Sequence, residues 1–458
     1  MNSKKILITN PIFYPNAKPH LGTAHTMILS DFLKRCFEIL GYDVCLTLGL
    51  DEHSEKVEKT AIQNNMSTVD FVNKLAKIFK DSIAKLNINY DIFIRTSDDN
   101  HKEAVKVFWN HMFDKGLIYK GKYSGYYSVS DETFFTEKSL INGKAPTGAD
   151  VTWENTDAYF FKSSLFKEQL MNFYNKNSNL TTPSNKINEL VSFVKDEFTD
   201  LCVSRKKGWG ISVPQDKAFT IYVWFDALIN YLTVCNYPYL NSYWNSRVIQ
   251  IIGKDIAIFH GVHWPSMLLA HENIKIFDDL LIHNWWLIDD NKMSKSKGNI
   301  IDPLTIVEKY GINVLRFFCI KENLISSDSS FDIKNMINAY NTFLVGKFSN
   351  LVYRLWVILY RDKKTSKIAK SNKIMEEKLA RQIENLEINN YVNTLFYWCD
   401  ELNSKIDQTQ AWKNSNIALD LFSETITLVK YFDCITPGIY NLLITNEEPV
   451  IFFHKIIT

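Results

Sequence analysis

Residues 5–48, KILITNPIFYPNAKPHLGTAHTMILSDFLKRCFEILGYDVCLTL, place strand-like segments on both sides of an amphipathic helix. Lys5–Asn10 is a short β-branched run of the kind found in buried strands. After a loop punctuated by proline and glycine, Thr26–Gly41 carries an apolar stripe at helical spacing and ends at a glycine. Tyr42–Leu48 is strand-like again. This unit predicts a parallel sheet with a right-handed crossover.

The same pattern returns later in the chain. Arg247–Gly253 is strand-like, Phe259–His271 has a helical pattern, and Asp279–Ile288 is strand-like. Residues 116–204 are richer in tyrosine, threonine and turn residues, which indicates a module inserted into the sheet domain. From about Ile333 onward helical patterns dominate, so a helix bundle is expected there.

The composition is that of a folded protein: 46% of the 458 residues are apolar and 22% are charged, and the chain is too long for one ordinary core. No apolar run resembles a membrane span, and the first residues contain no signal-peptide pattern. Seven cysteines are dispersed without a CxxC pair, as in a reducing compartment. We therefore expect a cytoplasmic protein. The net charge of +1 gives no sign of nucleic-acid binding, although a neutral protein can carry a basic face.

The first candidate for chemistry is the loop His20-Leu21-Gly22-Thr23, which lies between a strand and the start of a helix. Free backbone N–H groups and the positive end of a helix dipole suit a phosphate at this position. Gly22 allows the backbone to approach closely, and the imidazole of His20 can donate to phosphoryl oxygens. Taken alone, this pattern is more often a structural loop.

The second candidate is KMSKSKGN, residues 292–299, a lysine-rich loop that ends in glycine and asparagine. Several lysines on such a loop can close over a triphosphate and neutralise the charge that builds on a pyrophosphate leaving group. Taken alone, such a run is more often a solvated surface.

Together, the two loops resemble the paired motifs of the class I aminoacyl-tRNA synthetases. Further segments are similar to the methionyl-tRNA synthetase family: PIFYPNAKPHLG at 11–22, DEH at 51–53, YVWFDAL at 222–228 and GKDI at 253–256, the last followed by Phe259-His260 and Trp264-Pro265. The resemblance covers the chain from Ile6 to about Trp412. It implies an ATP-dependent ligase of protein biosynthesis. Such an enzyme forms methionyl-adenylate and pyrophosphate, and then transfers methionine to the 3′-terminal adenosine of methionine tRNA.

The resemblance also implies the fold class, α/β: a Rossmann-type parallel-sheet catalytic domain with an inserted connective module, followed by an all-α anticodon-binding bundle. We expect the two halves of the catalytic domain at 1–115 and 205–290, the inserted module at 116–204, the KMSKS loop and linker at 291–335, and the anticodon-binding domain at 336–458. No appended OB-fold domain follows Thr458, so a monomer is expected.

A methionine site follows from the same resemblance. Asp51, at the end of a strand, matches the carboxylate that holds the ammonium group. The thioether has no strong hydrogen-bonding group, so its pocket should be aromatic and polarizable. Without the family context, each aromatic side chain could equally be an ordinary core residue. The other positions that match the family's methionine pocket are Ile12, Tyr14, Trp224, Ala227, Leu228, Tyr231, Ile256, Phe259 and His260.

An ATP site, with Mg²⁺ on the nucleotide, is implied as well. Lys295, with Lys292 in the same loop, matches the position that acts on the α- and β-phosphates, and Arg205 matches a further phosphate-side arginine. The remaining matches are His20, Gly22 and Thr23 for the phosphates, Gly253 and Asp255 for the ribose, and the backbone of Trp286 for adenine. The expected catalytic residues are His20, Thr23, Lys292, Lys295 and Arg205.

The helical region resembles the part of the family that reads the CAU anticodon of initiator and elongator methionine tRNAs. Single-stranded bases are recognised by stacking on aromatic side chains. Trp412 matches the stacking tryptophan, although Ala411 stands where proline is usual. Asn350 and Arg354 match the other anticodon-reading positions. The alternative for Trp412 is an ordinary core residue.

Besides Ala411, the sequence departs from the family pattern in three places. Thr23 stands where histidine is usual, so slower activation is expected, and His25 is not expected to replace the missing imidazole. Ser54 stands where glycine is common. No cysteine lies between Cys45 and Cys202, so the inserted module cannot assemble the tetrahedral zinc site that many relatives carry there. No structural zinc is expected.

Four rival functions are less consistent with these motifs. A synthetase for isoleucine, valine or leucine needs an editing domain larger than this inserted module, because one methylene gives only about 10–200-fold discrimination. A cysteine-specific synthetase needs zinc-binding thiolates near its active site. A non-catalytic tRNA-binding protein has no need of His20, Asp51 and Lys295, and a small nucleotidyltransferase has no need of the helical tail. ATP–pyrophosphate exchange with each amino acid separates all of these.

Overall fold

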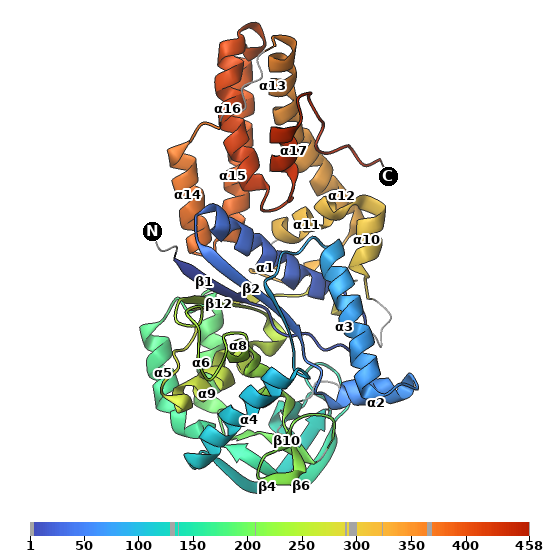
Figure 1. Cartoon of the computed structure of the whole chain (residues 1–458), viewed down its shortest axis with the longest axis vertical. Coiled ribbons are helices and arrows are strands. Elements are labelled where there is room, and N and C mark those ends of the chain that lie inside the picture. Colours follow the sequence, from blue (N-terminus) through green and yellow to red (C-terminus); the bar gives the residue numbers. More distant parts are fainter. Residues whose placement is uncertain are drawn as a thin grey trace.

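The computed structural model describes residues 4–128, 133–135, 137–206, 208–288, 291–292, 300–322, 324–363 and 369–457. In Figure 1 a parallel sheet lies across the middle of an elongated molecule. A helical bundle forms one end, and antiparallel strands of the inserted module form the other. The expected α/β fold with a C-terminal bundle is therefore confirmed.

The central sheet has six parallel strands, and its order identifies where a ligand can bind. In spatial order the strands are β3 (Ile92–Arg95), β2 (Asp43–Leu50), β1 (Lys5–Thr9), β12 (Arg247–Gly253), β13 (Asp279–His283) and β7 (Thr181–Thr182). The chain runs outward from β1 to β3 on one side and from β12 to β13 on the other, so the order reverses between β1 and β12. In such sheets, ligands bind beyond the carboxyl ends of the strands at this switch point.

Alternation along β1 explains why the sheet has a core on each face. The side chains of Ile6 and Ile8 belong to one core, and that of Leu7 belongs to the other. The first core contains α1 (Leu21–Ile39) and continues into the bundle. The second contains α4 (Asp99–Asp114), α7 (Val223–Leu228), α8 (Asn230–Thr233) and α9 (Trp264–His271). Outside these cores, α2 (Glu55–Gln63) packs on α3 (Thr68–Lys85).

The inserted module is mainly antiparallel. One of its sheets has the order β5 (Thr133–Phe135), β4 (Ile118–Ser128), β6 (Thr152–Phe161) and β8 (Leu201–Cys202). A smaller antiparallel sheet, mostly from residues that follow the module, has the order β10 (Ser212–Val213), β11 (Asp216–Ile221) and β9 (Ser204–Lys206). Between β6 and β8 the chain forms α5 (Lys167–Lys176), β7 and α6 (Lys186–Asp196), and β7 completes the edge of the parallel sheet. Residues 116–204 therefore contribute strands to the four-stranded antiparallel sheet and one edge strand, β7, to the parallel sheet.

After β13 the chain breaks instead of continuing as one strand to Ile288. Asn284 donates from its backbone N–H and its side chain to the carbonyl of Leu324, and a new strand, β14 (Trp286–Ile288), begins two residues later. This strand pairs with β15 (Asn291–Lys292) and β16 (Ser329–Ser330). The connection to the bundle contains α10 (Pro303–Tyr310) and α11 (Ile312–Lys321).

The bundle begins with one long helical stretch, Ile333–Arg361, in which a π-helical segment joins α12 (Ile333–Ala339) to α13 (Asn350–Arg361). By length and composition this stretch could span a membrane, with a mean hydropathy of 1.2. Leu344 and Leu355, however, are fully buried in the bundle core, and a core helix passes the same test. The remaining helices are α14 (Lys373–Glu384), α15 (Ile388–Thr409), α16 (Ser415–Phe432) and α17 (Ile439–Thr445).

Arg316 of α11 joins the sheet domain to the bundle. Its side chain is fully buried and pairs with Asp31 of α1 at 2.5 Å. The same guanidinium donates to the carbonyl of Leu86, which follows α3, at 3.3 Å and to the carbonyls of Cys434 and Ile435, which follow α16, at 3.4 and 3.0 Å. One buried cation thus holds segments from both parts of the chain.

Candidate functional site

The loop after β1 lies alongside the end of β2, and this brings the first expected methionine-site residues together. Phe13 donates its N–H to the carbonyl of Gly49 and accepts from the N–H of Asp51, both at 2.9 Å. Its neighbours Ile12 and Tyr14 are therefore fixed beside Asp51. Position 49 has to be glycine, because a Cβ there would lie 2.5 Å from the Ile94 carbonyl and 2.6 Å from Ile12.

Aromatic rings from three segments form a cluster beside this loop. Trp224 of α7 stacks on Phe259 with ring centroids 3.9 Å apart and planes 6° apart. Tyr14 and His260 both meet Trp224 edge-on, at 6.5 and 6.1 Å. The indole Nε1 of Trp224 is buried and has no partner among the described residues. These polarizable walls suit an apolar or thioether side chain.

The histidine in this cluster is neutral. His260 donates from Nδ1 to the carbonyl of Ile256 at 3.0 Å, so its Nε2 accepts the hydroxyl hydrogen of Tyr231 at 2.7 Å. Burial lowers the pKa of His260 to about 4 and raises the pKa of Tyr231. Neither group carries a charge near neutral pH, so this wall is suited to an uncharged side chain.

Asp51 supplies the negative charge at the edge of the cluster. It follows β2, is 2% exposed, and its charge adds to the effect of burial in raising the pKa of Tyr231. A carboxylate beside an uncharged aromatic wall suits a ligand with an ammonium group at one end and an apolar chain at the other.

Ala227, Leu228 and Ile256 lie on the same elements as these aromatic residues. Ala227 and Leu228 are buried in α7, the helix that carries Trp224, and Ile256 is half-buried in the turn that follows β12.

The loop His20-Leu21-Gly22-Thr23 forms the start of α1, but its backbone N–H groups are already used. His20 caps the helix, and its Nδ1 accepts from the N–H groups of Gly22 at 3.0 Å and Thr23 at 3.3 Å. The N–H of Leu21 donates to the carbonyl of Ile301 at 3.0 Å. The expectation of free N–H groups at this helix start is therefore wrong. Because Nδ1 accepts, Nε2 of His20 carries the hydrogen.

The contact between Leu21 and Ile301 also brings the two sequence motifs together. Lys292 lies in β15, opposite Leu287, and Ile301 follows the KMSKS loop. The stretch between them, residues 293–299 with Lys295, lies outside the described residues. Both ends of the loop are therefore fixed near the start of α1 and the edge of β14.

The nucleotide side of the switch point lies beyond β12. A Cβ at Gly253 would lie 2.7 Å from Oδ1 of Asp255, so a larger residue there would displace this carboxylate. Asp255 accepts from the indole of Trp285 at 3.4 Å. The side chain of Trp286 is not part of this surface: it is 1% exposed and stacks on Phe318 at 5.4 Å. Only the backbone of Trp286 can face a ligand.

Thr23 and His25 lie in the first turns of α1. Thr23 is 8% exposed, and the ring of His25 is buried against His283 and Trp286, with centroids 5.1 and 5.9 Å away. Burial and the nearby His283 lower the pKa of His25. His25 therefore faces the protein core.

Arg205 brings positive charge from β9 of the smaller antiparallel sheet. Its guanidinium lies over the ring of Tyr127 at 3.9 Å and over that of Tyr222 at 4.5 Å. Tyr222 is the residue before α7, so this stack connects β4, β9 and the helix that carries Trp224.

Sequence reasoning missed a buried cluster behind the aromatic wall. Asp226 of α7 accepts from His53 at 2.7 Å and from His101 at 2.8 Å. His53 was visible in the DEH motif, but nothing in the sequence connects it with His101. His283, at the end of β13, was also missed. It accepts from Thr26 at 2.8 Å, and its only signal is a histidine at a strand end.

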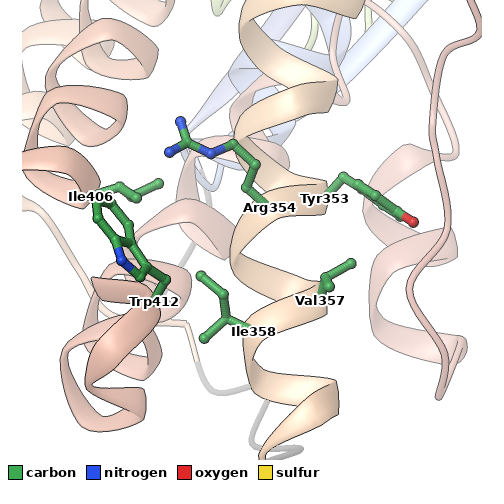
Figure 2. A pocket seen from close by; sticks show the side chains of 6 residues that line it. All are labelled: Tyr353, Arg354, Val357, Ile358, Ile406 and Trp412. Carbon is green, nitrogen blue, oxygen red and sulfur yellow. The ribbon is translucent and has the colours of Figure 1, made fainter. Parts of the chain in front are cut away.

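Two of the three expected anticodon residues, Arg354 and Trp412, line a groove of about 290 Å³ in the bundle (Figure 2). The indole of Trp412 and the guanidinium of Arg354 lie on the same side of α13, while Tyr353 points to the other side. Trp412 is 40% exposed, and its carbonyl accepts from Arg361 at 3.1 Å. Arg354 pairs with Asp407 at 2.8 Å. Asn350 is exposed one turn before Arg354. An exposed indole beside a cation suits a single-stranded base.

The described residues do not fit a protein-held metal. No group of three or more His, Cys, Asp or Glu side chains gathers within the described ranges, and all seven cysteines are buried and free. In the inserted module β4 and β6 pair directly, and Tyr126 meets Trp153 edge-on at 5.0 Å.

Comparisons with known proteins agree with this geometry. A family model described as class I tRNA synthetases (M) matches residues 6–151 and 145–356. The methionine–tRNA ligase of Rickettsia bellii is 38% identical over 426 residues, which cover 88% of this chain and 83% of that protein. The ligase of Rickettsia prowazekii is 40% identical over 361 residues, covering 78% of this chain and 71% of the relative.

Solved structures are similar over nearly the whole chain. A Mycobacterium tuberculosis methionyl-tRNA synthetase in complex with methionyl-adenylate has a TM-score of 0.88 and 30% identity, covering 96% of this chain and 93% of that one. The free state of that enzyme has a TM-score of 0.80 at 26% identity, covering 97% and 92%.

Proposed function

The chain belongs to the class I methionyl-tRNA synthetases, and we propose how its residues divide the work of a methionine–tRNA ligase. Such an enzyme activates methionine with ATP to methionyl-adenylate and pyrophosphate. It then transfers methionine to the 3′-terminal adenosine of methionine tRNA. One observation carries the assignment of the site: Asp51, the Trp224–Phe259 stack and the start of α1 gather at the carboxyl ends of the strands beside the switch point.

In the proposed methionine site, Asp51 pairs with the ammonium group. The thioether lies against Trp224, Phe259 and Tyr14, where sulfur–aromatic contacts contribute about 0.3–1.5 kcal/mol each. Tyr231 and neutral His260 close the pocket without presenting a charge to the sulfur. The remaining pocket residues are Ile12, Ala227, Leu228 and Ile256.

In the proposed ATP site, the nucleotide binds as its Mg²⁺ complex, which neutralises charge on the departing pyrophosphate. His20 donates from Nε2 to a phosphoryl oxygen, and the hydroxyl of Thr23 donates beside it. Asp255 accepts from the ribose hydroxyls, Gly253 leaves room for the sugar, and the backbone of Trp286 contacts adenine. Gly22 allows the phosphates to approach α1.

Activation then depends on positioning and charge. The methionine carboxylate attacks the α-phosphorus in line, and pyrophosphate leaves toward Lys292 and Lys295. Arg205 of β9 adds positive charge on the phosphate side. In the second step the ribose hydroxyl of the terminal adenosine attacks the carbonyl carbon, and AMP leaves. Holding the reactants in line and neutralising the leaving group account for most of the catalysis in such reactions.

Recognition of tRNA is assigned to the bundle. Trp412 stacks on one anticodon base, and Arg354 and Asn350 bind its neighbours in the CAU sequence of initiator and elongator tRNAs. The exposed indole beside a guanidinium supports this assignment. Because Arg354 is paired with Asp407 in the unbound protein, binding exchanges one charge partner for another.

The remaining parts of the proposal concern state and location. We propose a cytoplasmic location and no structural zinc; the second is supported by the absence of any cysteine between Cys45 and Cys202. Residues 1–115 and 205–290 form the catalytic domain, 116–204 the connective module, 291–335 the KMSKS loop and linker, and 336–458 the anticodon-binding domain.

The test is ATP–pyrophosphate exchange with each of the twenty amino acids in turn. Methionine alone should support rapid exchange. Exchange with isoleucine, valine, leucine or cysteine instead would overturn the assignment of the pocket. Exchange with none, together with tRNA binding, would identify a non-catalytic tRNA-binding protein.

A further inference from the structure

A buried carboxylate lies behind the proposed methionine site and touches neither methionine nor ATP in that proposal. Asp226 is fully buried, two residues after Trp224 and one before Ala227. Its Oδ2 accepts from Nδ1 of His53 at 2.7 Å, and its Oδ1 accepts from Nε2 of His101 at 2.8 Å. Both histidines are also buried.

The two histidines connect Asp226 to different parts of the molecule. His101 belongs to α4, and its Nδ1 bonds to the hydroxyl of Thr233 in α8 at 3.0 Å. This arm therefore ends in rigid helices. His53 belongs to the loop after β2, two residues from Asp51. This second arm ends at the proposed partner of the ammonium group.

The rest of the loop is held as firmly on its other side. Glu52 is fully buried, accepts from Arg95 at 2.7 Å and donates its N–H to Thr96 at 2.9 Å. The indole of Trp209 donates to the Glu52 carbonyl at 2.5 Å and meets His53 edge-on at 5.7 Å. The backbone on both sides of Asp51 is thus fixed, and the bond from His53 to Asp226 connects this loop to α7.

The charge of Asp226 is stable in this setting. Burial opposes its ionisation, but the two histidines outweigh that effect and hold its pKa below the usual value. Removing this charge while keeping the side-chain volume changes how strongly both histidines are held, because hydrogen bonds to a carboxylate are about twice as strong as neutral ones.

We propose that Asp226 is a positioning residue of the amino-acid site. Through His53 it sets the distance between the carboxylate of Asp51 and the aromatic wall of α7, so both ends of methionine are bound in register. The inference rests on the proposed methionine site. A misplacement of a reacting group by about 1 Å can lower the rate about 100-fold. Because this link joins two walls of the methionine site, loosening it affects methionine far more than ATP.

The first test compares Asp226→Asn with Asp31→Asn in methionine-dependent ATP–pyrophosphate exchange. Asp31 is the matched control: it is equally buried and pairs with Arg35 and Arg316, away from α7. We expect Asp226→Asn to raise the KM for methionine about 10- to 100-fold and to change the KM for ATP less than about twofold. Asp31→Asn should lower the melting temperature without this split. Equal changes in both KM values for Asp226→Asn, or a lower melting temperature alone, would make Asp226 a purely structural residue.

A second pair decides the matter if Asp226→Asn does not fold. In His53→Asn the side-chain N–H is bonded to Cγ, as Nδ1 is in histidine, so it can still donate to Asp226. His53→Ala cannot. A large rise in methionine KM for the alanine variant, mostly restored in the asparagine variant, supports the proposal, and equal effects overturn it. Asp51→Asn distinguishes a failure of this inference from a failure of the proposed methionine site. If it leaves the KM for methionine unchanged, the methionine site itself is wrongly placed.

Discussion

The proposed methionine site at the sheet end and the proposed anticodon groove of the bundle are built in opposite ways. The first is assembled from segments far apart in the chain, and its polar groups are buried and bonded to each other, as in Tyr231–His260. The second is built mainly on one helix and one turn, and its indole and guanidinium are partly exposed. A small substrate that must be told from its analogues needs fixed walls. A nucleic acid that binds and dissociates in each catalytic cycle can use an open surface. There Arg354 can give up its ion pair with Asp407 for a contact with the nucleic acid.

The sharpest way to break this comparison is to disable activation without touching the bundle. Lys295→Ala should lower kcat for ATP–pyrophosphate exchange about 100- to 1000-fold, as expected when one preorganised charge on a transition state is removed. Charging falls only as a consequence, and tRNA affinity should stay the same in a filter-binding assay. A loss of tRNA affinity as large as the loss of exchange would show that the loop serves the tRNA.

The converse variant is Trp412→Ala. Losing one aromatic–base stack removes about 1–3 kcal/mol of binding, so charging efficiency should fall about 5- to 150-fold. Methionine-dependent exchange needs no tRNA and should stay within about twofold of the parent. A protein in which exchange and charging fall together would show that Trp412 supports the fold.

A smaller effect is expected inside the sheet-end site. Trp224→Ala removes one sulfur–aromatic contact, worth about 0.3–1.5 kcal/mol, and should raise the methionine KM about 2- to 12-fold. The ATP KM should change much less. Equal losses for the two substrates in steady-state exchange would identify Trp224 as an ordinary core residue.

The pH dependence of the free energy of unfolding should also differ between the two regions. Burial holds the pKa of His260 and His263 at about 4, below the value of about 6.5 for an unfolded histidine. Between these values the unfolded chain binds more protons than the folded one, so stability falls as pH drops from about 6.5 toward 4. Above pH 6.5 these two groups contribute no slope. The bundle, residues 336–458, contains one histidine, the exposed His454.

Thermal melts from pH 8 to 5 measure this slope. His260→Gln should flatten it below pH 6.5, because one proton uptake on unfolding is lost. The same slope in the His260 variant and the parent would contradict the assignment.

The smallest expected effect is that of metal removal. Dialysis against a chelator should leave the melting temperature unchanged, and also the exchange rate once Mg²⁺ is supplied again with ATP. Elemental analysis should find well under about one zinc per chain. A stoichiometric, tightly bound zinc would contradict this prediction.

The regular parts of the fold could be predicted because local patterns determine them. The strand–helix–strand unit at the start of the chain and the helical bundle are visible as apolar periods, and both are present. The helix expected from Thr26 begins instead at Leu21, because His20 caps it. The break after β13 was not predictable, since it depends on Asn284 bonding to Leu324, forty residues away.

The site divides in the same manner. Residues in contiguous motifs, such as Asp51 in DEH, could be identified through the family resemblance. Asp226 could not be connected with His53 and His101 from the sequence, because it lies 173 residues after His53 and 125 residues after His101. The N–H groups at the start of α1 were expected to be free for the same reason: a side chain that folds back as a cap leaves no periodic signal.

The burial of Arg316 determines how the protein melts. Its guanidinium needs Asp31 and the carbonyls after α3 and α16 at the same time. If the bundle unravelled first, a positive charge would remain in an apolar interior with half of its partners lost, at a cost of several kcal/mol. The sheet domain and the bundle are therefore tied into one cooperative unit. In a calorimeter the sheet domain and the bundle should unfold in a single endotherm rather than as two separate peaks.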